Sequence, residues 1–141
     1  MNVKRLLFLA IIFIASTASA QSLNKTEPQQ FWDTNIQAIL DADVDRVVEQ
    51  SYFPMSTFEG DWSVRDFEDA FEILFDDSTL DALGKQTYRD IQAINDADGL
   101  TYMVVIVTYT EVDGELYESA TILSFKKFDK DWKLYNIDMA G

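Results

Sequence analysis

The sequence predicts an α+β fold in which N-terminal helices pack on a curved antiparallel sheet. Two patterns and one turn support this fold class. Apolar residues recur at three- and four-residue steps between positions 28 and 84, as in amphipathic helices, and the period changes to two from Tyr88 onwards. Asp113-Gly114 is a strong signal for a two-residue hairpin, because a type I′ turn needs positive φ at both positions.

The first twenty residues have the features of a secretory signal. Lys4 and Arg5 precede an apolar run from Leu6 to Ala15, and Ala18-Ser19-Ala20 has the small-x-small form of a cleavage site. A membrane span needs about 20 apolar residues, so this run is too short to be an anchor. The sequence predicts an exported protein, periplasmic or secreted, that has no membrane attachment after cleavage. The expected organisation is a signal peptide at 1–20, a flexible lead-in at 21–27 and a single domain at 28–141.

The mature chain is strongly acidic. Removal of Lys4 and Arg5 leaves nine basic side chains against 25 acidic ones, a net charge of −16. Such a surface repels phosphate backbones and anionic headgroups, so we expect neither nucleic acid nor membrane as a partner. The chain contains no Cys, which removes disulfides although an exported compartment would allow them.

The helices are expected in order along the first half of the mature chain. Pro28 suits the first turn of a helix whose apolar face carries Trp32, Ile36, Ile39 and Leu40. Asp43 caps a second, short helix. An extended edge segment follows at Tyr52-Phe53-Pro54-Met55.

Ser63 is the N-cap of the clearest helix, and Asp66 follows three residues later in its first turn. Apolar residues continue at helical spacing to Leu74. A further short helix is expected from Ser78 to Gly84.

The hairpin turns set the register of the sheet. The Asp113-Gly114 turn pairs Val112 with Glu115 and therefore Tyr102 with Phe125. A turn at Asp129-Lys130-Asp131 would pair Phe128 with Trp132 and Phe125 with Tyr135.

This register divides the strand residues between two faces. The face expected under the helices carries Ile91, Ala93, Tyr102, Val104, Ile106, Leu123, Phe125, Tyr135 and Ile137. The opposite face, which includes Trp132, is apolar at its centre, at Val105, Val107, Ile122 and Leu134. An apolar centre on an uncovered face predicts an interface with a partner, and we expect this partner to be a second copy of the chain.

The order of elements resembles the nuclear transport factor 2-like (SnoaL-like) superfamily. The residues that carry the resemblance are the Asp41-Ala42-Asp43-Val44 junction, the segment around Pro54, and the hairpin from Thr121 to Phe128 and from Asp131 to Ile137. Small exported cystatin-like domains have a similar order of helices and strands. The resemblance implies a cone-shaped sheet whose open end can hold a small apolar molecule, and dimerisation through the outer sheet face. It does not choose a function, since members include isomerases, dehydratases, cyclases, hydrolases and proteins that only bind.

The sequence contains few groups of residues that could bind a metal or catalyse a reaction. Asp41, Asp43 and Asp45 begin like a calcium loop, but Arg46 stands where the loop needs Gly, so helix capping explains them better. The chain has no His and no Cys, which excludes triads that use these residues and His-ligated zinc. We expect no cofactor and no metal.

Aromatic and hydroxyl side chains are expected to share the inner face or its rim. They are Trp62, Tyr102, Tyr117, Thr121, Phe125 and Tyr135. They form either a pocket for a small apolar ligand or an amphipathic rim that closes the core.

Three functional hypotheses follow from these observations. The first is a non-catalytic exported domain that binds a small apolar ligand or a protein. The alternative is an isomerase or hydrolase of the resembled type, in which a buried carboxylate works with a Tyr hydroxyl. The third is an accessory domain with a purely structural role, whose cone is filled by its own side chains. The register places no Asp or Glu on the inner face between Ile91 and Thr121, so the binding hypothesis is preferred.

Overall fold

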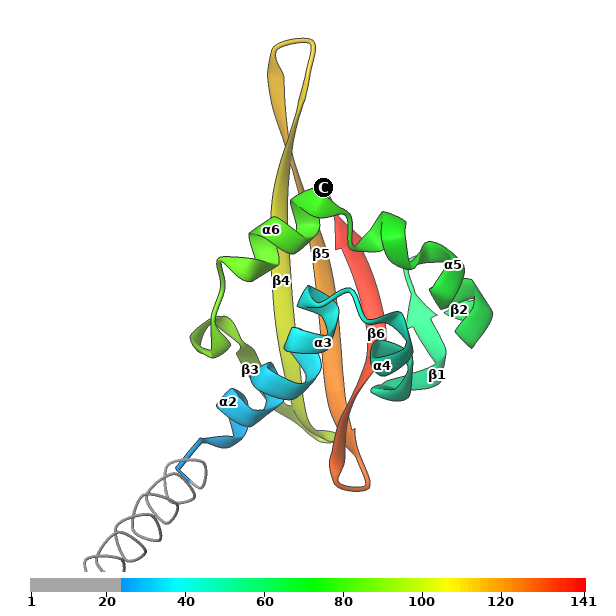
Figure 1. Cartoon of the computed structure of the whole chain (residues 1–141), viewed down its shortest axis with the longest axis vertical. Helices are drawn as coiled ribbons and strands as arrows, with labels where there is room; N and C mark the ends of the chain where they lie inside the picture. The colour runs from blue at the N-terminus through cyan, green and yellow to red at the C-terminus, as the bar shows by residue number, and fades with distance from the viewer. Residues whose placement is uncertain (1–23) are drawn as a thin grey trace, which may run out of the picture.

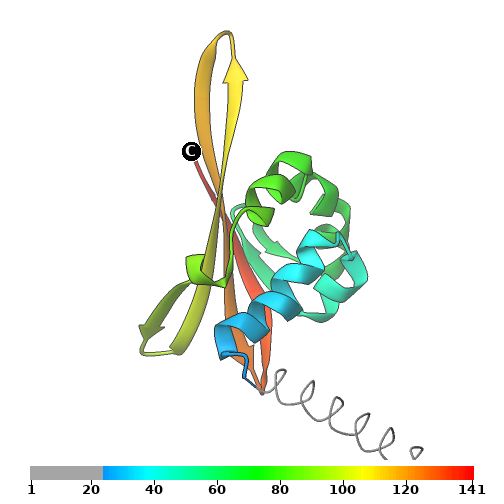
Figure 2. The same ribbon diagram turned by 60° about the vertical axis from the view of Figure 1, so that its left-hand side comes forward.

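The computed structural model describes residues 24–141, and the expected signal peptide at 1–20 lies outside the described residues. A six-stranded sheet in the order β2-β1-β6-β5-β4-β3 carries the helices on one face (Figures 1 and 2). The predicted α+β class is confirmed. The helices are α2 (Glu27–Phe31), η1 (Trp32–Ile36), α3 (Gln37–Leu40), α4 (Val44–Glu49), α5 (Val64–Leu74), α6 (Asp77–Gly84) and η2 (Tyr88–Asp90). The strands are β1 (Ser51–Thr57), β2 (Gly60–Trp62), β3 (Gln92–Asp96), β4 (Gly99–Val112), β5 (Glu115–Phe128) and β6 (Asp131–Ala140).

The first predicted helix is a continuous helical run that changes its winding. The segment η1 between α2 and α3 is a π-helix, which is rare and occurs often at functional sites. Asn35 lies in this wide turn, is buried, and donates its side-chain amide to the carbonyl oxygen of Trp132 at 2.9 Å. The π-helical turn therefore ties the first helix to β6.

The predicted caps are confirmed at two helices. Asp43 accepts a hydrogen bond from the backbone N–H of Arg46 at 3.3 Å, which explains this acidic residue as the N-cap of α4. At the start of α5 the Ser63 and Asp66 side chains form a reciprocal capping box. The buried face of α5 carries Phe67, Phe71 and Leu74.

The hairpin between β4 and β5 has the predicted register. Val112 pairs with Glu115 and Tyr102 pairs with Phe125. Asp113 and Gly114 have φ values of 53° and 80°, as a type I′ turn requires.

The predicted register between β5 and β6 is wrong by one residue. The turn has two residues, Asp129-Lys130, so that Phe128 pairs with Asp131 and Lys127 pairs with Trp132. Asp129 adopts positive φ (59°), which the short turn needs and Asp tolerates. The slip of one residue turns Trp132 and Leu134 into the core, at 8% and 1% exposure, away from the outer face on which they were expected.

A β-bulge at Tyr135 then restores the later part of the expected register. Ser124 pairs with Asn136 while Phe125 pairs with Leu134, which leaves Tyr135 as the additional residue on β6. Ile137 is therefore buried, as predicted. Tyr135 is half-buried beside the Lys126 ammonium, 5.1 Å from the ring centroid, and does not join the core.

The first strands make the sheet mixed. The expected edge segment becomes β1, which lies between β2 and β6 and runs parallel to β6. Its register against β6 shifts between Ser51 and Ser56, a stretch that contains Pro54, whose nitrogen cannot donate to the ladder. The edge on this side is instead the short β2. On the other side of the sheet β3 is exposed along its whole length, so Ala93 is not in the core.

Candidate binding groove

The six residues predicted to form one ligand pocket do not meet around a single cavity. Tyr102, Thr121 and Phe125 are buried on the inner face of the sheet, as expected. Trp62 lies on the edge strand β2, separated from β4 by β1, β6 and β5. Tyr117 is 52% exposed near the tip of the β4–β5 hairpin.

The space expected to hold an apolar ligand is filled by aromatic side chains of the chain itself. The Phe31 ring lies edge-on to Tyr102 and Phe125, with centroid distances of 5.1 and 4.8 Å. Trp132, brought inward by the register, stacks on Tyr102 at 4.0 Å. Such pairs contribute about 0.5–1.5 kcal/mol each beyond the area they bury. This part of the inner face is therefore packed core, in line with the structural interpretation of the aromatic set.

A cavity of about 670 Å³ lies beside this cluster, between the first helix, the end of α4 and the β5–β6 hairpin. Its volume falls within the range of about 300–1,000 Å³ that is usual for small-molecule sites. We call it the lysine groove. It is lined by Glu27, Gln30, Phe31, Thr34, Asn35, Glu49, Gln50, Lys127, Lys130, Asp131, Trp132 and Lys133.

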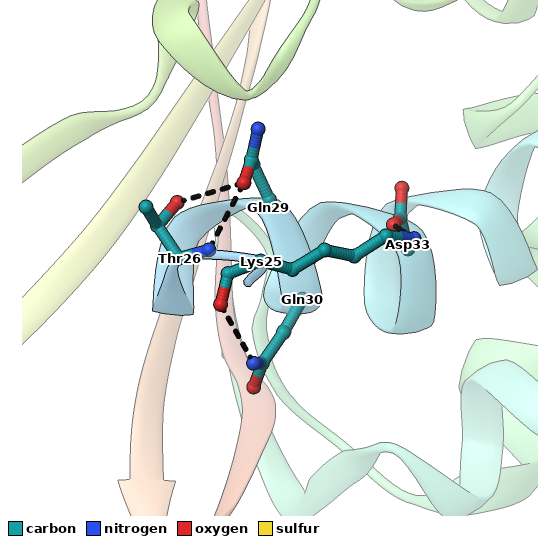
Figure 3. A network of polar contacts seen from close by, with 5 residues as sticks. All are labelled: Lys25, Thr26, Gln29, Gln30 and Asp33. Atoms are coloured by element: carbon teal, nitrogen blue, oxygen red, sulfur yellow. Dashed lines mark hydrogen bonds and ion pairs between the residues drawn. The ribbon is translucent and has the colours of Figure 1, made fainter. Parts of the chain in front are cut away.

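Three segments position these side chains. Hydrogen bonds at the start of α2 hold the first helix in place (Figure 3). There the backbone N–H of Thr26 donates to the Gln29 side chain, and the Gln30 amide donates to the Lys25 carbonyl oxygen, both at 2.9 Å. The π-helical turn η1 then places Thr34 and Asn35 on the groove wall. The β5–β6 hairpin supplies the lysines from the opposite side, with Lys127 on β5, Lys130 in the turn and Lys133 on β6.

The charge of the groove differs from that of the rest of the surface. Three of the nine basic side chains and three of the 25 acidic ones among residues 24–141 line it. The groove is therefore locally neutral, and the remaining surface carries the whole excess of negative charge. At physiological ionic strength charges more than about 8 Å away are largely screened, so the three lysines and three carboxylates of the groove determine the local potential.

The lysines have different surroundings. Lys127 forms an ion pair with Glu27 and lies over the Trp132 ring, 5.5 Å from its centroid. The Lys133 ammonium donates to the carbonyl oxygen of Glu49 at 2.5 Å and retains two further N–H donors. Lys130 is exposed at the tip of the turn. Lys130 and Lys133 are thus the cations best placed to meet an anionic group.

Two buried polar atoms on groove-lining residues have no hydrogen-bond partner among residues 24–141. They are the acceptor Oε1 of Gln50 and the donor Nε1 of Trp132. A buried polar atom left without a partner costs about 1–3 kcal/mol. Both residues line the groove, and the two unpartnered atoms themselves are buried.

A carboxylate lies near a tyrosine hydroxyl at two places. On the exposed arm of the β4–β5 hairpin the Tyr117 hydroxyl donates to the Glu115 carboxylate at 2.9 Å, and at the buried Tyr102 the nearby carboxylate is that of Glu27. Burial raises the pKa of the Tyr102 hydroxyl, the Glu27 carboxylate raises it further, and Lys127 opposes both. A raised pKa keeps the phenol protonated at neutral pH, so it does not serve as a base. Glu27 is itself held in the ion pair with Lys127.

Residues 24–141 contain neither a candidate metal cluster nor a candidate membrane span. Residues 24–141 contain no group of three His, Cys, Asp or Glu side chains that could hold a metal ion. No helix in this part of the chain is long and apolar enough to cross a membrane.

The outer face of the sheet keeps three of the four predicted interface residues. Val105, Val107 and Ile122 are half-buried on the face opposite the helices, whereas Leu134 belongs to the core. The expected apolar centre is therefore two strands wide instead of three. The homodimer expected through this face stays a prediction.

One signal of the groove is present in the sequence as a cluster of lysines. Lys126, Lys127, Lys130 and Lys133 fall within eight residues of an otherwise acidic chain, and this signal was available in the sequence. The π-helical turn, by contrast, has no marker in the apolar spacing of the first helix.

The comparisons with known proteins give one structural likeness. No protein-family model matches the chain, and no curated protein matches it. Among solved structures, the chain is similar to an NTF2-like protein with a cystatin-like fold from Novosphingobium aromaticivorans. The two share 16% sequence identity with a TM-score of 0.38, over 74% of this chain and 72% of that chain. A likeness at this level of identity gives no information on ligand or activity.

Proposed function

We propose that this protein binds a small hydroxylated organic acid, or a phosphate monoester, in the lysine groove without catalysing a reaction. The observation that carries the proposal is the gathering of Lys127, Lys130 and Lys133 around a cavity in a chain whose net charge is −14. Ammonium groups bind carboxylate and phosphate oxygens through charge-assisted hydrogen bonds, which are roughly twice as strong as neutral ones. This ligand class replaces the small apolar molecule expected from the sequence.

The hydroxyl group in the proposed ligand follows from the unpartnered atoms. Gln50 Oε1 needs a donor and Trp132 Nε1 needs an acceptor, and a hydroxyl supplies either. The exposed hydroxyl of Thr34 adds a further polar group at the same wall. An unsubstituted dicarboxylate would satisfy the lysines alone and bind more weakly.

The enzymatic alternative has less support from the geometry. Tyr102 is 4% exposed and stacked on Trp132, and its neighbour Glu27 is engaged by Lys127. A general acid or base must reach a substrate proton at hydrogen-bond distance. Binding by the groove needs no such access to Tyr102.

The test is thermal unfolding with defined probes. We expect citrate, malate, gluconate or glycerol phosphate to raise the melting temperature, and succinate, which lacks a hydroxyl, to raise it less. The double variant Lys130→Gln/Lys133→Gln should abolish the increase. The matched control is Lys85→Gln. Lys85 follows α6, forms an ion pair with Asp81 and does not line the groove.

Two results would reject the proposal. One is the absence of any increase with all four hydroxylated probes at millimolar concentration. The other is an equal increase in the wild-type protein and in the Lys130→Gln/Lys133→Gln variant, which would place the binding elsewhere.

Export is a second part of the proposed role. The basic start, the short apolar run and Ala18-Ser19-Ala20 support removal of residues 1–20 during secretion. The intact mass of the protein recovered from its native host should correspond to a chain that begins at Gln21. A cell-associated chain that retains Met1 would contradict export.

A further inference from the structure

The β4–β5 hairpin extends far beyond the helices as a two-stranded ribbon (Figures 1 and 2). We call residues Tyr109–Glu118 the hairpin arm. All ten of its residues are exposed, and its strands pair only with each other. An isolated two-stranded ribbon is only marginally stable in water. A third strand would pair with a strand that is already ordered, and its hydrogen bonds would stabilise the arm.

The arm presents large apolar side chains to solvent. Tyr109, Val112, Leu116 and Tyr117 are between 50% and 68% exposed. Tyr109 and Leu116 share the outer face of the sheet with Val107 and continue its apolar stripe towards the tip. Across the ladder Tyr109 faces Glu118 and Leu116 faces Glu111, so apolar and acidic side chains alternate on this face of the arm. Val112 and Tyr117 lie on the other face.

The charge of the arm is of one sign. Glu111, Asp113, Glu115 and Glu118 are all exposed, and the arm contains no Lys or Arg. Acidic groups that alternate with apolar ones select a partner that carries basic groups between apolar ones. A second copy of the chain is disfavoured here, because two adjacent arms would bring eight carboxylates together.

One edge of the arm is open to a further strand. β3 pairs with β4 only as far as Met103, and at Val105 the Gln86 amide donates to the outward carbonyl oxygen at 2.7 Å. Residues two apart on a strand direct their backbone groups to the same side, so those of Val107, Tyr109 and Glu111 also point to this edge. Beyond Gln86 no described residue pairs with these strand groups.

The other edge is obstructed near the body of the domain. β6 pairs with β5 up to Ala120, and Gly141 then lies against Glu118 and Ser119 so closely that a Cβ at this glycine would be 2.5 Å from the Glu118 carbonyl oxygen. The β4 edge is therefore the longer free edge of the arm.

We propose that the hairpin arm binds an extended segment of another protein, in which Lys or Arg alternates with apolar residues, as a third strand at the β4 edge. Backbone hydrogen bonds to Val107, Tyr109 and Glu111 provide the pairing. Because side chains alternate between the two faces, the basic side chains of the segment lie on the outer face, beside Glu111 and Glu118 and against the Tyr109 ring. Its apolar side chains lie on the other face, beside Val112 and Tyr117. Addition of a strand gives affinity through the main chain and specificity through alternate side chains, so both features are separately testable.

The first experiment uses synthetic peptides. A fluorescein-labelled ten-residue peptide of alternating Lys and Val is titrated with the purified protein, and fluorescence anisotropy reports binding. The same peptide with N-methyl groups on alternate residues has the same charge but cannot complete the ladder on one side. We expect the dissociation constant to rise at least tenfold on N-methylation. Equal binding of both peptides would overturn strand addition.

Matched charge variants locate the site. Glu111→Gln/Glu115→Gln/Glu118→Gln removes three charges from the arm, and Glu68→Gln/Asp69→Asn/Glu72→Gln removes three exposed charges from α5. We expect the first variant to lose at least tenfold in affinity and the second to change by less than threefold. Equal losses would show general attraction to an acidic protein and would overturn the proposal.

Matched apolar variants provide a second comparison. Val112→Asn and Ile73→Asn each replace an exposed aliphatic side chain, at 50% and 80% exposure, so neither should unfold the protein. Binding should weaken only in Val112→Asn, because Val112 lies on β4 and on the face that the apolar side chains of the segment cover. A dimer of the free protein at micromolar concentration that Val112→Asn dissociates would overturn the choice of partner.

Discussion

Trp132 stacks on Tyr102 with ring centroids 4.0 Å apart and an angle of 12° between the planes. This pair connects the hydrophobic core with the lysine groove. Its rings complete the core beneath the first helix, and Trp132 also lines the lysine groove. A change in the core at this point therefore changes the wall of the groove.

Replacement of Trp132 by Ala should lower the free energy of unfolding by about 3–5 kcal/mol, as for other large aromatic residues truncated in cores. The loss includes its contacts with Tyr102 and Phe31. Urea denaturation followed by circular dichroism measures it. Ile73→Ala, at an 80% exposed position, is the control and should change stability by less than about 0.5 kcal/mol. Similar values for the two variants would contradict the placement of Trp132 in the core.

The register of β6 predicts opposite outcomes at two neighbouring positions. Leu134→Glu buries a carboxylate where exposure is 1%, so it should prevent folding or destabilise strongly. Tyr135→Glu changes the bulged, half-buried residue and should leave a folded protein. Thermal unfolding of both variants distinguishes this register from the one expected from the sequence, under which Tyr135→Glu would be the damaging substitution.

The capping box of α5 predicts that the protein loses stability as pH falls into the acid range. The hydrogen bond from the Ser63 backbone N–H to the Asp66 carboxylate, at 2.9 Å, lowers the pKa of Asp66, and the Ser63 hydroxyl adds to the effect. A lowered folded-state pKa stabilises the fold above the usual value of about 3.9, and this stability is lost as pH falls through the folded pKa. Asp66→Asn should therefore be less stable than wild type at neutral pH and closer to it in strong acid. A constant difference between pH 7 and pH 2 would contradict this cap.

The raised pKa of Tyr102 predicts that the protein loses stability as pH rises into the alkaline range. Burial first, and the Glu27 carboxylate second, raise the pKa of its hydroxyl above the usual value of about 10. Its contribution to stability is complete below that value and is lost as pH rises through the folded pKa, because the unfolded chain ionises first. Ultraviolet titration should show one tyrosine that ionises after the others, and Tyr102→Phe should remove that step. Loss of an ordinary step instead would contradict the assignment.

The sequence predicted the fold best where local chemistry determined it. The Asp113-Gly114 turn allows one register for β4 and β5, and Ser63 with Asp66 marks the start of α5, so both predictions were confirmed. The β5–β6 register failed because Asp129-Lys130-Asp131 permits turns of two lengths. A choice between them depends on burial of Trp132 and Leu134, which is a tertiary effect.

The site was less predictable than the fold. The inward location of Tyr102 and Phe125 followed from the register, but their packing against Phe31 could not be deduced, since it depends on where the first helix crosses the sheet. The lysine groove combines residues from positions 27 to 133, and its hydrogen bond from Asn35 to Trp132 depends on a π-helical turn. The cluster of lysines was visible in the sequence, whereas the cavity beside it was not.

The central claim is that the lysine groove is the binding site, and an NMR titration tests it most directly. Citrate is added to ¹⁵N-labelled protein, with succinate as the comparison and the Lys130→Gln/Lys133→Gln variant as the control. We predict saturable shifts in the Gln50 side-chain amide, the Trp132 indole N–H and the backbone of Thr34, with larger shifts for citrate, and none of them in the variant. Shifts confined to residues outside the groove, or unchanged in the variant, would contradict the claim.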